Sequence, residues 1–249
     1  MRTTVNRDTS RVSVTPDLVA WVRGLISLAF VLLLPLLVIS TSLRGLVTDR
    51  ELMLRGFRDN QVATTTGLDD AQLGRIADLF VAYFQGPPGQ IQMQVTAFGQ
   101  SRALFNDREV SHMEDVQALI QFFLRMQFVA AAVVAVRVAS ALVFDRSPAP
   151  IGREMLWATA LMVALVVVVG VLSLLDFDGL WTRFHQIAFR NDLWQLDPTR
   201  DYLIMLFPEP FWFTATIRMA TTVAVQTVLV VALGVALIFS QRFFGDRPA

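Results

Sequence analysis

The chain has 249 residues, of which 54% are apolar and 17% charged, and its mean hydropathy is positive. The charges stand between long apolar blocks, which is typical of integral membrane proteins and excludes an ordinary soluble domain. The net charge is zero and there is no basic tail, so nothing indicates a nucleic-acid partner. Cysteine is absent and all 21 basic residues are arginine, which excludes disulfides, thiolate metal sites and Schiff-base chemistry.

Four apolar segments are each long enough to cross about 30 Å of hydrocarbon as a helix. They cover residues 18–40, with Pro35 as the expected kink, 118–144, 155–175 and 212–240. The first is not expected to be a cleaved signal peptide, because its apolar run is long and no small-residue cleavage site follows it. The sequence therefore predicts an α-helical integral membrane protein with four transmembrane helices.

Arginine is concentrated in three short segments, 1–17, 145–154 and 241–249. The other side of the spans has more arginines, but they are spread over long loops that count only in part toward orientation. We therefore expect both termini in the cytoplasm, with the segments 41–117 and 176–211 facing outward. The seven arginines behind this assignment are Arg2, Arg7, Arg11, Arg146, Arg153, Arg242 and Arg247.

The segment 41–117 is expected to fold into a small mixed α/β domain. Residues 69–84 carry apolar side chains at helical spacing, and the sequence GPPG at 86–89 stops that helix. Residues 90–98 alternate apolar and polar side chains, as a half-buried strand does. A turn at 99–101 would return the chain as a hairpin through residues 102–105.

The segment 176–211 is expected to lie at the membrane surface as a re-entrant or interfacial loop. A short helix is predicted over 180–189, and Asp197 followed by Pro198 predicts a second helix start. Aromatic side chains suited to the headgroup level are Trp181, Trp194, Phe207, Phe211 and Trp212.

The chain has only two histidines, His112 and His185, and the four-span topology places both on the same outer face near the membrane boundary. Ser111 and Glu114 fit a capping box that would put His112 in the first turn of a helix. An alternative cap, formed by Asn106 with Glu109, would start that helix one turn earlier.

Imidazole has the intrinsic pKa for general acid–base catalysis at neutral pH, and Glu109 or Asp115 could orient His112. Spacing alone favours the plainer alternative of an interfacial histidine bonded to a neighbour. Metal binding is a third alternative, since E-x-x-H can supply two ligands, but the spans lack the further carboxylates and histidines such sites need.

Four arginines lie in or at the spans. Arg23 and Arg137 fall toward the cytoplasmic side and are expected to snorkel. Arg125 and Arg218 lie about 10 Å below the outer surface, where they could bind a lipid phosphate or stabilise an oxyanion. Outward snorkelling, or pairing with a loop carboxylate, is the alternative for both.

Two motifs, FNDREVSHMEDV at 105–116 and FHQIAFRNDLWQLDPTRDYLIMLFPEPFW at 184–212, resemble the bacterial lipoprotein intramolecular transacylase family. The four-span layout is similar as well. Family members often carry Lys soon after the first motif, where this chain has Gln117.

The resemblance implies a diacylglyceryl lipoprotein substrate in the outer leaflet of the bacterial cytoplasmic membrane, among membrane phospholipids. The α-amine of its N-terminal cysteine would attack the sn-2 ester, and the acyl chain would move to nitrogen without a cofactor or an acyl-enzyme. His112 and His185 would act as base and acid. The supporting residues would be Glu109, Asp115, Arg125, Arg218, Trp194 and Asp197.

Two other functions stay open from the residues. A non-catalytic lipid- or lipoprotein-binding scaffold would keep the outer domain and tolerate loss of both histidines. A transporter ranks last, because spans one and three lack broken helices and deep polar residues, apart from Pro35 and Gly170. The oligomeric state is not indicated.

Overall fold

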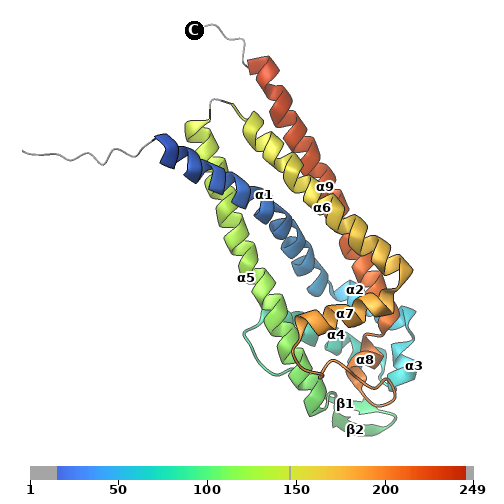
Figure 1. Ribbon diagram of the computed structural model, residues 1–249. Helices are drawn as coiled ribbons and strands as arrows, with labels where there is room; N and C mark the ends of the chain where they lie inside the picture. The colour runs from blue at the N-terminus through green and yellow to red at the C-terminus, as the bar shows by residue number, and fades with distance from the viewer. Residues whose placement is uncertain (1–15, 146, 245–249) are drawn as a thin grey trace, which may run out of the picture.

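The computed structural model describes residues 16–145 and 147–244, so the expected tails lie largely outside it, with Arg2, Arg7, Arg11, Arg146 and Arg247. Four long helices form the body of the molecule (Figure 1). Each contains an apolar window of the length and composition that can cross a membrane. They are α1 (Pro16–Val47), α5 (Asp107–Phe144), α6 (Ala149–Leu175) and α9 (Glu209–Phe244).

The helices are longer than the apolar spans that predicted them, because polar turns continue them at their ends. The largest extension is in α5, whose 38 residues reach about 57 Å at about 1.5 Å per residue. Its first eleven residues precede the expected span 118–144, and they carry His112. A polar helical segment thus projects from the apolar bundle.

Helices α6 and α9 pack closely because glycine meets glycine between them. A Cβ atom on Gly152 would lie 2.5 Å from the carbonyl oxygen of Gly234. Small residues allow the backbones of membrane helices to approach in this way. On the outward faces, large apolar side chains such as Leu142 and Val228 are exposed, as contact with lipid requires.

The two long connections between the long helices, α1 to α5 and α6 to α9, form one cluster at one end of the bundle, which we call the head (residues 48–106 and 176–208) (Figure 1). Its core is aromatic: Phe80 meets Phe105 and Phe207 edge to face, with ring centroids 6.0 and 4.8 Å apart. Its elements are α2 (Arg50–Asp59), α3 (Val62–Thr66), α4 (Asp70–Gln85), β1 (Gln94–Ala97), β2 (Gln100–Ala103), α7 (Phe177–Ala188) and α8 (Tyr202–Leu206).

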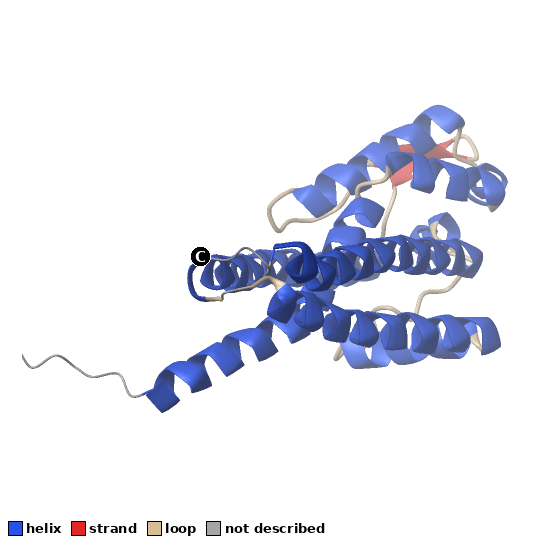
Figure 2. Cartoon of the chain, turned by 90° about the horizontal axis from the view of Figure 1, so that it is seen from above, coloured by secondary structure: helices blue, strands red, loops and turns tan. Residues whose placement is uncertain are grey.

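The helix α4 and the antiparallel hairpin β1–β2 match the elements expected in this segment, and Figure 2 shows the hairpin lying among the head's helices. The turn is one residue earlier than expected. Ala97 pairs with Gln100, and Phe98 and Gly99 between them both have positive φ, at 50° and 79°. Two left-handed residues suit a tight hairpin turn. The sequence analysis did not identify α2 or α3.

Two local expectations were wrong, for Asp197 and Arg137, and of the two caps left open for α5 the alternative one is present. Helix α5 begins after the alternative cap, because Asn106 and Glu109 form a reciprocal capping box and Ser111 with Glu114 does not. Asp197 does not cap a helix; its carboxylate binds Thr199 in a turn, and α8 begins only after Asp201.

Arg137 does not snorkel either. It is 5% exposed and binds both carboxylate oxygens of Glu154, at 2.8 and 2.9 Å, and Asp145 at 3.1 Å. Arg23 pairs with the other oxygen of Asp145. Ion pairs therefore join the helices at this end of the bundle, and those of Arg137 are buried.

Candidate active site

His112 is placed by the capping box at the start of α5. The Asn106 side chain accepts a hydrogen bond from the backbone N–H of Glu109, and Glu109 accepts one from the N–H of Asn106. His112 follows in the second turn and is 5% exposed. Its Nδ1 atom is buried and has no hydrogen-bond partner among the residues that the structure describes.

His185 lies near the end of α7, opposite His112, and is 7% exposed. Its Nδ1 is 2.8 Å from the carbonyl oxygen of Trp181, one turn earlier. A carbonyl oxygen only accepts, so Nδ1 must carry the proton. In the neutral ring Nε2 then holds the lone pair, which is the form a general base needs.

The structure brings the two histidines together, with ring centroids 6.0 Å apart. They come from elements 73 positions apart in sequence, one on α5 and one on α7. Aromatic rings enclose His185, with centroids at 4.7 Å for Trp181, 5.1 Å for Trp194 and 5.6 Å for Phe189. Phe189 also contacts the His112 ring at 5.1 Å. This wall keeps water from both imidazoles.

Burial keeps both imidazoles neutral at neutral pH. Desolvation, the neighbouring His185 and the Arg108 cation lower the pKa of His112 to about 4, against the opposite influence of Asp115. Desolvation also lowers the pKa of His185, and its bond to the Trp181 carbonyl offsets part of that effect. Neutral imidazoles can accept protons, as acid–base catalysis near pH 7 requires.

Glu109 does not orient His112, contrary to expectation. It is 1% exposed, and its second oxygen accepts a hydrogen bond of 2.6 Å from the backbone N–H of Leu203 in α8. Both carboxylate oxygens therefore accept hydrogen bonds from backbone N–H groups, and neither binds His112. Glu109 ties the start of α5 to the segment that follows His185, and so fixes the two halves of the site.

Asp115 lies on the turn after His112 and binds the side chain of Asn191 at 2.8 Å. It joins α5 to the loop after α7. On the other side of His112, Arg108 donates to the carbonyl oxygen of Asp192, and its Nε is buried without a partner.

The sequence analysis missed Arg108, although its spacing of four residues from His112 on one helix was a usable signal. It also missed the roles of Trp181 and Phe189, whose contacts with the histidines depend on how the loop folds.

Of the other expected site residues, Trp194 lies at the histidine pair, whereas Arg125, Arg218 and Asp197 lie farther along a helix or bind other groups. Trp194 contacts His185. Arg125 lies thirteen residues beyond His112 on α5, about 20 Å along the helix. Arg218 pairs with Asp49, the residue that caps α2, so it takes the alternative of a loop carboxylate. Asp197 is occupied in its turn.

Comparisons with known proteins identify the family and the fold. The model of the family "Lipoprotein intramolecular transacylase Lit" matches residues 28–212. An uncharacterized protein of Aquifex aeolicus is 23% identical over 227 residues, which is 91% of this chain and 100% of that protein.

Solved structures of the membrane integral lipoprotein intramolecular transacylase Lit from Bacillus cereus share the fold. One aligns with a TM-score of 0.78 and 15% identity over 90% of this chain and 99% of that chain. A form with one histidine replaced by arginine aligns with a TM-score of 0.73 and 14% identity, over 91% and 96%.

Proposed function

This chain belongs to the lipoprotein intramolecular transacylase family and is an acyltransferase of the membrane. From the geometry of its site, we propose that the two histidines catalyse transfer of the sn-2 acyl chain of a diacylglyceryl lipoprotein to the α-amine of its N-terminal cysteine. The observation that carries the proposal is the pair of buried, neutral imidazoles facing each other across α5 and α7. Donor and acceptor sit on one molecule, so positioning provides much of the acceleration.

His185 is the general base in this proposal, because its Nε2 is the nitrogen with the free lone pair. The α-ammonium loses one proton to solvent as it becomes the free amine, whose nitrogen attacks the ester carbonyl carbon while His185 takes a second proton from that nitrogen. The tetrahedral intermediate collapses by breaking the bond from that carbon to the sn-2 oxygen. A histidine returns the proton to this oxygen, which leaves as the hydroxyl of the lyso product.

His112 and Arg108 stabilise the developing oxyanion. Both carry a buried nitrogen without a partner, His112 at Nδ1 and Arg108 at Nε. A neutral imidazole with Nδ1 protonated can donate to an oxyanion, and a guanidinium adds positive charge in a site that excludes water. The reaction needs no covalent acyl-enzyme and no cofactor.

The substrate's acyl chains reach the site from the membrane. Helix α7 exposes Phe184 and Ile187, 42% and 87% accessible, on the same helix that carries His185. An amphipathic helix of this kind lies in the plane of the membrane surface. The head and both histidines then face outward and both termini are cytoplasmic, in keeping with the arginine distribution.

The orientation is tested with an accessibility tag inserted near residue 88, in the loop that follows α4. Modification by a membrane-impermeant reagent in intact cells is expected. Protection in intact cells, with modification after lysis, would place the histidines on the wrong side for mature lipoproteins.

The chemistry is tested by incubating the pure protein with a diacyl lipopeptide and weighing the products. His185→Gln and His112→Gln are each expected to lower the rate at least about 100-fold, the usual contribution of general acid–base catalysis. Gln186→Ala, an exposed neighbour on α7, serves as the control. Full conversion by both histidine variants would show that the histidines do not carry the catalysis, and no conversion by the wild type would leave a lipid-binding role.

A further inference from the structure

Two arginines without carboxylate partners stand at the boundary between the bundle and the head, away from the histidines. Arg44 lies in the last turn of α1, and Arg125 lies on α5. Both are exposed, and within the described part of the chain neither forms an ion pair, whereas Arg23, Arg50 and Arg218 do. Charges near the hydrocarbon boundary are costly unless something binds them.

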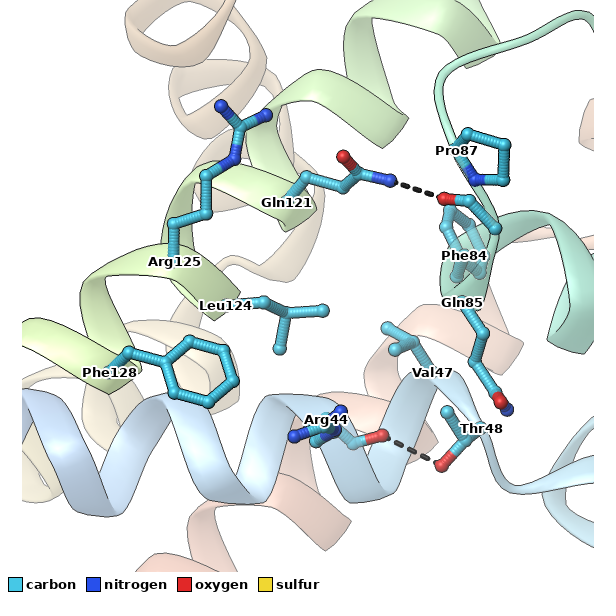
Figure 3. Close-up of a pocket in the computed structure, with 11 residues that line it drawn as sticks. Arg44, Val47, Thr48, Phe84, Gln85, Pro87, Gln121, Leu124, Arg125 and Phe128 are labelled. Atoms are coloured by element: carbon cyan, nitrogen blue, oxygen red, sulfur yellow. Dashed lines mark hydrogen bonds between the residues drawn. The ribbon is translucent and has the colours of Figure 1, made fainter. Parts of the chain in front are cut away.

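A hollow of about 380 Å³ lies between these two arginines. Figure 3 shows Arg44 on α1 and Arg125 on α5, with Leu124 between them and Val47 next to Thr48; the exposed Arg125 side chain is drawn with its guanidinium turned away from Arg44 and would rotate to meet a ligand. Phe128 lines the hollow on α5, one turn beyond Leu124, and is 67% exposed. The hollow thus joins two cations to an apolar wall that continues along the lipid-facing side of α5.

We propose that this hollow binds one anionic phospholipid, with its phosphate between Arg44 and Arg125 and an acyl chain along Phe128. Guanidinium groups bind phosphate oxygens through paired, charge-assisted hydrogen bonds. The two arginines lie at similar depth. Gln127 of α5 donates to Thr41 of α1 at 2.8 Å, and Arg44 and Arg125 lie three and two residues from this contact toward the head, about 3–5 Å at 1.5 Å per residue.

The surroundings fix the side on which the phosphate sits. A neighbouring hollow of about 370 Å³ shares Gln121 and Arg125 but is bordered by Glu114, whose carboxylate would repel an anion. No carboxylate is among the described residues that line the hollow beside Arg44. The phosphate therefore belongs on the Arg44 side. The site is separate from the transacylation chemistry and does not depend on it.

The full-length protein, purified in detergent, is mixed with phosphatidylglycerol, phosphatidylcholine or glycerol 1-phosphate, and the retained molecules are measured by native mass spectrometry. Wild type should retain phosphatidylglycerol in preference to phosphatidylcholine. Arg44→Gln/Arg125→Gln should weaken this retention at least about tenfold, since two charged hydrogen-bond donors are lost. The matched control is Arg58→Gln/Arg75→Gln, which removes two exposed arginines from the head and should change nothing.

The doubly substituted variant Arg44→Lys/Arg125→Lys keeps both charges if the glutamine variant fails to fold. It should retain lipid at an intermediate level, because lysine lacks the paired geometry of the guanidinium. Equal retention by wild type and both arginine variants would overturn the proposal. So would binding of glycerol 1-phosphate as tight as that of the lipid, since the ligand would then be a soluble phosphate.

Discussion

Two clusters of buried polar side chains lie at opposite ends of α5 and use their hydrogen-bonding groups differently. In the Arg137 cluster (Arg137, Glu154, Asp145 and Arg23), Arg137 binds both oxygens of Glu154, and Asp145 uses one oxygen for each arginine. In the histidine site, His112 Nδ1 and Arg108 Nε are buried with no partner. About 38 Å of helix separates His112 from Arg137, at about 1.5 Å per residue.

The difference separates structural from reactive polar groups. A buried charge that is fully paired holds its neighbours in one geometry, but it has no group left for a ligand. A buried polar atom without a partner costs about 1–3 kcal/mol, and at the histidine site we propose that the substrate completes these hydrogen bonds. We therefore propose a structural role for the Arg137 cluster and a catalytic role for the histidine site.

The largest expected effect comes from breaking the paired cluster. Arg137→Met leaves Glu154 buried without its partner, and the free energy of unfolding should fall by about 3–5 kcal/mol. The measurement is thermal unfolding in detergent. Arg75→Met, at an exposed arginine, is the control.

The double variant Arg137→Met/Glu154→Met should recover much of that loss, because both buried charges are removed together. His112→Gln should be nearly neutral in the same assay. The comparison fails if His112→Gln destabilises the protein as much as Arg137→Met does.

The next largest effect is expected at Glu109, whose hydrogen bonds join the start of α5 to α8. Glu109→Gln replaces one accepting oxygen by an NH₂ group, which would face the N–H of Asn106 or Leu203. A loss of about 1–3 kcal/mol is expected, together with slower acyl transfer as α7 and α8 shift relative to α5. Glu114→Gln, exposed on the same helix, is the matched control. Equal activity of the two variants would show that Glu109 does not position the site.

Several features of the fold could be predicted from the sequence. The four apolar spans follow from composition alone, because a helix that crosses lipid needs about twenty apolar residues whatever its neighbours are. The helix α4 and the hairpin follow from local periodicity. Both histidines could be placed near one boundary by counting spans. Each of these inferences rests on residues close together in the chain.

The failures have the opposite origin. Glu109 was expected to orient His112, three residues away, but its oxygens bind Asn106 and Leu203, and the second contact spans 94 residues. Asp197 followed by Pro198 has the local signal of a helix start, yet Asp201 competes by accepting from the Asp197 N–H at 2.7 Å. No local pattern reports which carboxylate a folded loop will use.

Acid should affect the histidine site through His112. The pKa of its ring is about 4 in the folded protein, against about 6.5 in an unfolded chain. The unfolded state therefore binds more protons between these values, and stability falls as the pH drops from about 6.5 to about 4. His112→Gln should remove part of this dependence. Melting temperatures at pH 7.5 and pH 5 measure it, and an unchanged slope in the variant would assign the effect to other groups.

The smallest expected effect is that of the Arg108 cation on His112. Arg108 is the last of the three influences that lower this pKa, after burial and His185. Arg108→Gln removes the charge, so the pKa of His112 should rise slightly, while Arg108→Lys should leave it close to its original value. Because the chain has two histidines, NMR of the labelled imidazole rings gives two titrations, which His185→Gln assigns. If Arg108→Gln and Arg108→Lys shift His112 equally, Arg108 acts on the site through its bond to the Asp192 carbonyl, not through its charge.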